Sequence, residues 1–335
     1  MMRVGFVGAG LQARRRVPIF AKLKDVKLVT ISAEHLDHAQ ALAGPAGCEA
    51  LAGWEWIGKR DDLDAVIVAT PPHLHERISV MAMKTGKHVL CEKPLAKTLE
   101  ECENMLRVSK ETGKILKCGF NHRHHPAVLE ARKLLDQGKL GKPLFARSRY
   151  GIIGMPGREN EWRADLTKAS GGHLMEQGIH AVDLSRWFLG DFDDVAGFRE
   201  TQYWPFPKGI EDNGFMIMRS RTGRMASVQA SLLQWKNLFS FEVYGDEGFV
   251  EVEGLGGAYG TEKLHFCPKH YDRPFAVTTT EFRGEDKSWL LEWQEFAAAV
   301  RESRTPLGSA EDGMEAMRLV FEAYRYSDRK ETAFK

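Results

Sequence analysis

The sequence carries almost no net charge and lacks any long apolar run. Lys and Arg together number 47 and Asp and Glu number 46, so the formal net charge is +1. This balance argues against nucleic acid or an anionic membrane as the main partner. No apolar run approaches the length that spans a bilayer, and the N-terminal residues lack the pattern of a signal peptide. A small molecule is therefore the expected partner.

Cysteine is scarce, and internal repeats and low-complexity segments are absent. The five cysteines are scattered and form no C-x-x-C pair, so the sequence shows no zinc site or disulfide framework. We expect reduced thiols in a cytoplasmic protein and no bound metal. The 335 residues are 43% hydrophobic and 28% charged, an ordinary globular composition in a chain too long for one compact core. Two domains are therefore predicted.

The chain begins with a short apolar strand that runs into a glycine-rich turn. Residues 8–13 read Gly-Ala-Gly-Leu-Gln-Ala, the G-x-G-x-x-A form of the dinucleotide-binding turn. Gly8 permits a tight turn, Gly10 leaves room for a pyrophosphate, and Ala13 lets the next helix pack closely on the strand. The N-terminus of that helix offers free N–H groups to the phosphates. The expected contacts here are Gly8, Gly10, Leu11 and Gln12.

Strands and helices alternate through the first third of the chain. Apolar runs predict strands, and the periodic segments between them predict helices. The expected strands are 3–7, 26–31, 65–69, 88–91 and 115–119, and the expected helices are 14–23, 36–43, 75–85 and 99–112. Such alternation is typical of parallel crossovers, so residues 1–122 are predicted to form a doubly wound Rossmann domain of the α/β class.

Three segments fall at the carboxyl ends of these strands, where such sheets bind their ligands. They are the glycine turn, Thr70-Pro71-Pro72 and Glu92-Lys93-Pro94. We expect them to meet in one crevice. The further cofactor contacts predicted at these strand ends are Ser32, Ala33, Thr70, Pro71, His75, Glu92 and Lys93.

The second part of the chain, residues 123–335, has a different pattern. Successive strands separated by turns predict a largely antiparallel open sheet in an α+β domain. The expected strands are 144–153, 194–201, 214–220, 225–233, 239–244 and 249–252, and the expected helices are 126–137, 173–188, 289–302 and 309–326. One face of such a sheet would be exposed in a monomer. We therefore expect a homo-oligomer, a dimer or tetramer, whose interface buries that face.

Charged and ionisable residues follow one stripe of the predicted helix 173–188. Glu176, His180 and Asp183 are spaced i, i+4 and i+7, which on an α-helix is one face. A carboxylate beside an imidazole suits proton transfer. An exposed charged face without chemistry is the alternative, and a metal site would need further ligands that the spacing does not supply.

These motifs together resemble the Gfo/Idh/MocA oxidoreductase family, named for glucose–fructose oxidoreductase and inositol dehydrogenase. The resemblance is carried by Glu92-Lys93-Pro94, by Ala-Thr-Pro-Pro-His-Leu-His at 69–75, and by the Gly-Gly…Gly-x-His-x-x-Asp segment at 171–183. It covers nearly the whole chain, up to the Gly-Ser-Ala-Glu-Asp-Gly of 308–313. It implies NAD or NADP and hydride transfer between nicotinamide and a secondary alcohol or ketone of a sugar, cyclitol, sugar acid or sugar derivative.

The resemblance also implies roles for individual residues. Lys93 corresponds to the lysine that touches the substrate hydroxyl and the nicotinamide, and His180 to the catalytic histidine. Glu176 stands where the family usually has Asp, so its catalytic role is expected with a longer side chain. Ser170 replaces the first glycine of the usual triple, and Asp183 is expected to cap or anchor the helix.

Three more residues are expected around the substrate. Arg123 follows the last Rossmann strand, and Trp162 and Arg163 precede the Gly-Gly helix. Arg suits carboxylate or phosphate groups, and Trp can stack on a sugar ring. Ion pairs between the two domains are the alternative for both arginines. The apolar residues of the last helix, Tyr324 among them, are expected to serve core packing alone.

The end of the second strand bears on which nicotinamide cofactor binds. Ala33 occupies the family's usual acidic position, which favours NADP, with Ser32 and one of Arg14–Arg16 available for a 2′-phosphate. At least two of those arginines are expected to be solvated. Glu34, one residue along, would serve NAD if it turned inward.

Two other functions fit the same motifs. One is cofactor-assisted, redox-neutral elimination, in which transient oxidation releases a leaving group. The other is a non-catalytic NAD(P)-sensing regulator, which has no need of both Lys93 and His180.

Overall fold

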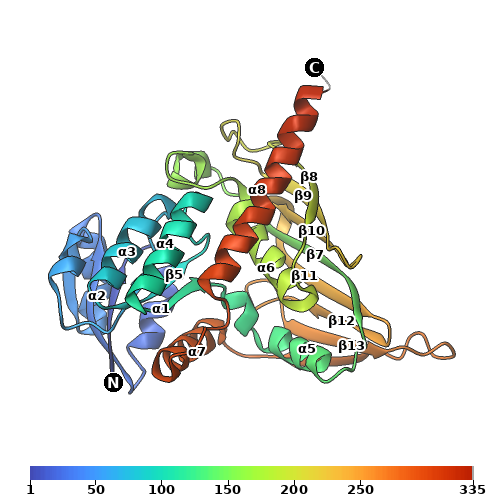
Figure 1. Ribbon diagram of the computed structural model, residues 1–335, viewed down its shortest axis with the longest axis horizontal. Helices are drawn as coiled ribbons and strands as arrows, with labels where there is room; N and C mark the ends of the chain where they lie inside the picture. Colours follow the sequence, from blue (N-terminus) through green and yellow to red (C-terminus); the bar gives the residue numbers. More distant parts are fainter. Residues whose placement is uncertain (334–335) are drawn as a thin grey trace. The chain divides into compact units, whose positions relative to one another are not determined.

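The computed structural model describes residues 1–333 and divides into two compact units, each continuous in space but not in sequence (Figure 1). The first unit contains Met1–Phe120, Thr167–Ser170 and Trp289–Met314. The second contains Asn121–Leu166, Gly171–Ser288 and the described residues from Glu315 onward. Segments 167–170 and 289–314 thus lie in the first unit, although they follow the predicted boundary at residue 122.

The first unit is built on a six-stranded parallel sheet in the order β3-β2-β1-β4-β5-β6. Its strands are β1 (Met2–Val7), β2 (Val26–Ala33), β3 (Glu49–Ala52), β4 (Ala65–Val68), β5 (His88–Glu92) and β6 (Leu116–Gly119). This confirms the predicted Rossmann sheet. Strand β3 was not predicted, because its Glu-Ala-Leu-Ala is short, lies at the sheet edge and contains no β-branched residue.

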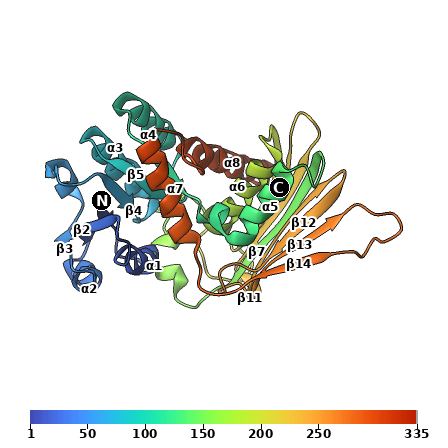
Figure 2. The same ribbon diagram turned by 90° about the horizontal axis from the view of Figure 1, so that it is seen from below.

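Helices cover both faces of this sheet, with α3 and α4 on one side and α1 and α2 on the other (Figure 2). Their bounds are α1 (Leu11–Phe20), α2 (Leu36–Ala46), α3 (His75–Lys84) and α4 (Leu99–Thr112). A later helix, α7 (Ser288–Glu302), adds Trp293 and Phe296 to the core that contains Phe6 and Phe20. The Phe20 and Trp293 ring centroids are 4.6 Å apart. This packing explains why a segment so late in the sequence belongs to the first unit.

The second unit holds an eight-stranded sheet in the order β14-β13-β12-β11-β7-β10-β9-β8. Its strands are β7 (Pro143–Ile153), β8 (Asp194–Glu200), β9 (Asn213–Arg219), β10 (Met225–Ser231), β11 (Leu233–Gly245), β12 (Gly248–Glu253), β13 (Glu262–Pro268) and β14 (Thr278–Phe282). Every described pair is antiparallel except β7 with β10, which confirms the predicted sheet.

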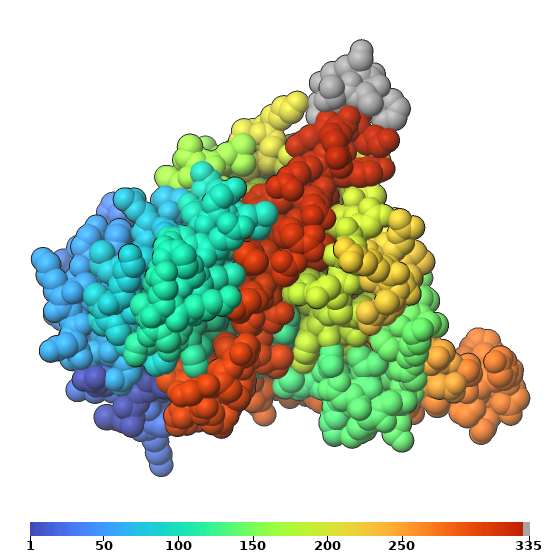
Figure 3. All heavy atoms as spheres, viewed as in Figure 1, coloured from blue at the N-terminus to red at the C-terminus, as the bar shows by residue number. Residues whose placement is uncertain are grey.

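The hairpin of β13 and β14 was not predicted from the sequence. The Thr-Thr-Thr-Glu-Phe of β14 has no buried residue and therefore no alternation to detect. The residues that join the two strands project beyond the sheet (Figure 3).

One face of this sheet is covered by helices and the other is open (Figure 2). The helices are α5 (Pro126–Asp136), α6 (Ile179–Leu189) and part of α8 (Ala310–Ala333). Along β9 the side chains alternate, with Met216 and Met218 buried and Phe215 and Ile217 52% and 57% exposed. Phe198 on β8 lies opposite Phe215 and is also exposed. The open face therefore carries large apolar side chains.

The predicted α-helix over 173–188 is wrong at its start. Leu174–Gly178 forms a π-helical turn, and α6 begins only at Ile179. A π-turn has more residues per turn than an α-helix, so the i, i+4 spacing of Glu176 and His180 does not place them on one α-helical face.

A buried carboxylate explains this local geometry. The backbone N–H groups of Gly172 and Leu174 donate to the Glu211 carboxylate at 3.0 and 2.9 Å. A Cβ on Gly172 would lie 2.3 Å from backbone atoms of Glu211, so only glycine fits there. The Tyr324 hydroxyl donates to the same carboxylate at 2.6 Å, so confining Tyr324 to core packing was also wrong. Burial raises the pKa of Glu211.

Candidate functional site

The glycine turn of the first unit has the geometry that a dinucleotide requires. Gly8 has φ +109°, and a Cβ there would lie 2.3 Å from the carbonyl oxygen of Ala69. Its N–H donates to the carbonyl oxygen of Ser32 at 2.8 Å, which holds the turn against the end of β2. A Cβ on Gly10 would meet nothing within 4 Å. The residues present therefore leave open space beside the backbone.

The start of α1 adds donors to that space. Gly10 is its N-cap, no side chain caps it, and its first turn contains no acidic residue. Its first N–H groups and the positive end of its dipole are therefore available to an anion. Ala13 is fully buried in the core, as the close packing of α1 on the sheet requires. A nicotinamide dinucleotide fits this arrangement through its pyrophosphate.

The residues at the end of β2 differ in their accessibility. The Ser32 hydroxyl is buried and lies 3.4 Å from the carbonyl oxygen of Phe6, so it is directed into the sheet. Ala33 is also buried, whereas Glu34 is exposed directly after the strand. Of the three arginines of α1, Arg14 and Arg15 are exposed and Arg16 is fully buried.

The segment around Lys93 is tied to the loop after β4. The His75 ring is buried, with Nε2 2.8 Å from the carbonyl oxygen of Thr70 and Nδ1 2.9 Å from that of Pro94. Burial lowers the pKa of His75. His75 thus links the Thr70 loop to the residue that follows Lys93. The predicted cofactor contact at His75 would therefore act through the backbone it holds.

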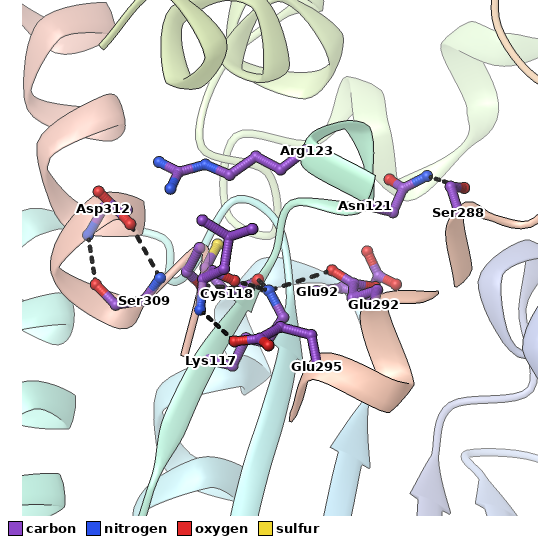
Figure 4. A network of polar contacts seen from close by, with 12 residues as sticks. Glu92, Lys117, Cys118, Asn121, Arg123, Ser288, Glu292, Glu295, Ser309 and Asp312 are labelled. Atoms are coloured by element: carbon purple, nitrogen blue, oxygen red, sulfur yellow. Dashed lines mark hydrogen bonds and ion pairs between the residues drawn. The ribbon is translucent and has the colours of Figure 1, made fainter. Parts of the chain in front are cut away.

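Glu92, which directly precedes Lys93, belongs to a buried ionic cluster that no local sequence pattern indicates. Arg16 Nη2 lies 2.6 Å from Glu92 Oε1 and 2.7 Å from Glu292 Oε2. Lys117 Nζ lies 3.6 Å from Glu292 Oε1 (Figure 4). Although burial alone lowers the pKa of Arg16, Glu92 and Glu292 raise it overall. The cluster contains two cations and two carboxylates.

In the second unit, Glu176 accepts from two arginines. Its Oε2 lies 2.7 Å from Arg158 Nη2 and its Oε1 2.6 Å from Arg163 Nε. Arg163 also stacks over the Trp162 ring at 4.5 Å. Burial lowers the pKa of Arg163, but Glu176 more than offsets this, so the pKa is raised. The structure thus brings together the predicted residues Trp162, Arg163 and Glu176, and adds Arg158.

The Arg123 side chain pairs with Asp183. Its Nε and Nη2 donate to the two carboxylate oxygens of Asp183 at 2.8 and 2.6 Å, and both side chains are buried. Asp183 anchors α6 in this way, as expected. Arg123 and Arg163 both pair with carboxylates of their own unit. Each of these two ion pairs therefore lies within the second unit.

His180 lies against a residue that the sequence analysis overlooked. The His122 ring, in the 3₁₀ turn Asn121–His124, has its centroid 3.8 Å from that of His180. The three histidines within residues 122–125 could have indicated such a contact. Only the structure shows which of them meets His180.

Comparisons with known proteins identify the family. The chain matches the model of the oxidoreductase family, NAD-binding Rossmann fold, over residues 2–120, and the GFO/IDH/MocA C-terminal domain over residues 128–251. It is 30% identical over 249 residues to scyllo-inositol 2-dehydrogenase (NAD(+)) of Bacillus subtilis, which covers 73% of this chain and 70% of that protein. The chain belongs to the Gfo/Idh/MocA family of oxidoreductases.

Two further comparisons extend this assignment. The chain is 28% identical over 285 residues to levoglucosan dehydrogenase of Pseudarthrobacter phenanthrenivorans, covering 74% of this chain and 73% of that one. A levoglucosan dehydrogenase structure in complex with NADH and levoglucosan has the same fold, with a TM-score of 0.86 at 24% identity over 98% of this chain and 97% of that chain.

The resemblance read from the motifs is therefore confirmed. The chain is a nicotinamide-dependent oxidoreductase acting on CH–OH groups. Within residues 1–333, no helix is long and apolar enough to cross a membrane. The same part of the chain shows no group of three or more His, Cys, Asp or Glu side chains placed to hold a metal ion.

The ionic cluster yields a prediction on stability. Replacing Arg16 by Met leaves Glu92 and Glu292 buried with one cation fewer, so the free energy of unfolding should fall by about 3–5 kcal/mol. Arg14→Met, two residues earlier and exposed, should change it by less than about 0.5 kcal/mol. Chemical denaturation of the full chain measures both variants. Equal stabilities would show that the cluster contributes nothing to folding.

Proposed function

We propose that this protein transfers a hydride between a nicotinamide dinucleotide and a secondary alcohol or ketone of a sugar or cyclitol. The observation that carries the proposal is the family membership, combined with Lys93 and His180 at the family's motif positions. The relatives named for levoglucosan and scyllo-inositol support a ring polyol as substrate. Sugar acids and sugar derivatives lie within the same chemistry.

In this proposal, His180 transfers the proton and Lys93 stabilises the charge on the reacting oxygen. The bound nicotinamide supplies the hydride acceptor or donor. In oxidation, His180 takes the hydroxyl proton as general base, and in reduction it returns that proton. The Lys93 ammonium stabilises the negative charge that develops on the oxygen. Arg16 and His75 support the segment that presents Lys93, through Glu92 and Pro94 respectively.

The cluster of Trp162, Arg163 and Glu176 is our candidate for binding the substrate's other hydroxyl groups. A carboxylate between two guanidinium groups offers both acceptors and donors, and an indole can lie against the apolar face of a sugar ring. We assign Arg123 a supporting role through Asp183, because both groups of that pair are buried.

The catalytic assignment predicts a specific kinetic pattern. Lys93→Met and His180→Ala should each lower turnover by about a hundredfold or more, because they remove a charge or a proton acceptor that acts in the transition state. Cofactor affinity should stay within about tenfold. Absorbance of the reduced nicotinamide measures turnover on a panel that includes levoglucosan, inositols and sugar acids. Turnover close to that of the unaltered enzyme in either variant would refute the assignment.

We further propose NAD rather than NADP as the physiological cofactor. The sequence alone favoured NADP because Ala33 occupies the usual acidic position and Ser32 was available for a 2′-phosphate. The Ser32 hydroxyl, however, is buried and directed at the Phe6 carbonyl. Arg16 is committed to the ionic cluster. Glu34, by contrast, is exposed directly after β2, where a carboxylate accepts from ribose hydroxyls and repels a 2′-phosphate.

This proposal predicts tighter binding of NADH than of NADPH. Glu34→Ala should lower the ratio of the NADPH to the NADH dissociation constant by about tenfold. Most of this change should come from tighter NADPH binding, because the substitution removes a negative charge that repels the 2′-phosphate. Asp37→Ala, at an exposed acid on the adjoining helix, is the matched control and should leave the ratio within about twofold. Fluorescence titration gives the constants. Tighter binding of NADPH by the unaltered protein would overturn the proposal.

We also propose that the open face of the eight-stranded sheet is the interface of a homo-oligomer. Phe198, Phe215 and Ile217 form an exposed apolar patch on β8 and β9, and such patches mark interaction surfaces.

Light scattering at micromolar concentration should therefore give a multiple of the 37.8 kDa chain mass. Ile217→Glu should shift the mass toward the monomer, because a charge would be buried in the interface. Tyr271→Glu, on the loop between β13 and β14, is the control. A monomeric mass for the unaltered chain would exclude the interface.

A further inference from the structure

His180 is stacked on a second imidazole. The ring centroids of His122 and His180 are 3.8 Å apart and the ring planes differ by 32°, so the rings lie nearly face to face. Both side chains are buried. The two residues come from different elements, His122 from the 3₁₀ turn Asn121–His124 and His180 from α6, and both belong to the second unit.

Two tyrosine hydroxyl groups in series hold the His122 imidazole in place. His122 Nε2 lies 3.1 Å from the Tyr150 hydroxyl, which donates to the Tyr259 hydroxyl at 3.1 Å. Because the Tyr150 hydrogen is directed to Tyr259, the Tyr150 oxygen accepts from an Nε2–H of His122. A neutral imidazole satisfies this bond. Tyr150 is itself buried on β7, so the hydroxyl that orients His122 has a fixed position.

The short separation restricts how the two rings can be charged. Two imidazolium groups at this distance repel strongly, so the pair takes up one proton at most. When His180 takes that proton, His122 stays neutral and keeps its Nε2–H bond to Tyr150. A neutral aromatic ring facing a cation attracts it. His122 then favours the protonated form of His180.

Other ionisable groups near the pair are already engaged. Beside His122, the His125 Nδ1 lies 3.1 Å from Glu262 and 4.0 Å from Asp286. On α6, Asp183 is paired with Arg123. The ring neighbours of the pair on β7 and β11 are Tyr150 and Phe239, which carry no charge near neutral pH.

We propose that His122 is a positioning residue for His180: its ring face, held by Tyr150 and Tyr259, orients the His180 imidazole and stabilises its protonated form. The functional meaning of this inference rests on the proposed role of His180 as acid and base. The physical coupling of the two rings does not, and it can be measured separately.

The test compares two substitutions of similar size. His122→Phe keeps an aromatic face against His180, whereas His122→Leu removes it. In the full-length protein with ¹³C-labelled histidine, the NMR signal of the His180 ring, assigned by its loss in His180→Ala, is followed against pH. We expect His122→Leu to move the His180 titration midpoint down by about half to one pH unit and His122→Phe to leave it within about 0.3 unit.

Two further variants complete the design. Tyr150→Phe removes one oxygen, keeps the packing and should give a smaller shift in the same direction, so the proposal stays testable if His122→Leu does not fold. His265→Leu, on β13, is the matched control and should not move the His180 midpoint. Thermal unfolding confirms that each variant is folded.

The possible outcomes are distinct. An unmoved midpoint in both His122→Leu and Tyr150→Phe overturns the inference, as does an equal shift in His122→Phe and His122→Leu. If the midpoint shifts as expected but His180→Ala retains turnover, the coupling stands and the proposed catalytic role fails. If both hold, the acidic limb of the turnover profile in the oxidation direction should move to lower pH in His122→Leu, because a base with a lower midpoint is active at lower pH.

Discussion

A single buried guanidinium, that of Arg16, joins three segments of the first unit that are distant in sequence. Arg16 sits one turn into the helix that follows the glycine turn, and it holds Glu92, which immediately precedes Lys93. Its second partner, Glu292, comes from α7, near the end of the chain. Removing any one of these charges leaves the others buried and uncompensated, which is energetically unfavourable. The position of Lys93 therefore depends on two helices distant in sequence.

The second unit uses a buried carboxylate in a comparable way. Glu211 accepts from the N–H groups of Gly172 and Leu174 and from Tyr324, and it thereby sets the start of the segment that carries Glu176 and His180. The adjoining π-turn is a short, less regular helix that this support stabilises. In both units, a buried carboxylate supports the segment that contains a candidate catalytic residue.

Local patterns predicted the sheet classes and the dinucleotide turn because those features leave a signal within a few residues of sequence. The tight turn at Gly8 and the close helix packing at Ala13 follow from spacing alone. The missed features are long-range. Nothing near Arg16 in the sequence indicates Glu292, and the alternation rule cannot detect β14, which buries no residue. Glu211 and Tyr324 were missed for the same reason, since their bond spans 113 residues.

The two arginine partners of Glu176 explain why a longer side chain than Asp fits at this position. The Glu176 carboxylate reaches Arg158 and Arg163 at once, and two guanidinium groups stabilise a carboxylate in its ionised form. An ionised carboxylate held in this way is a poor donor or acceptor of the substrate proton, because protonation would break both ion pairs. This favours our proposal that His180, whose imidazole lies against His122, is the acid and base. Glu176 instead holds the arginines beside Trp162 in a fixed arrangement.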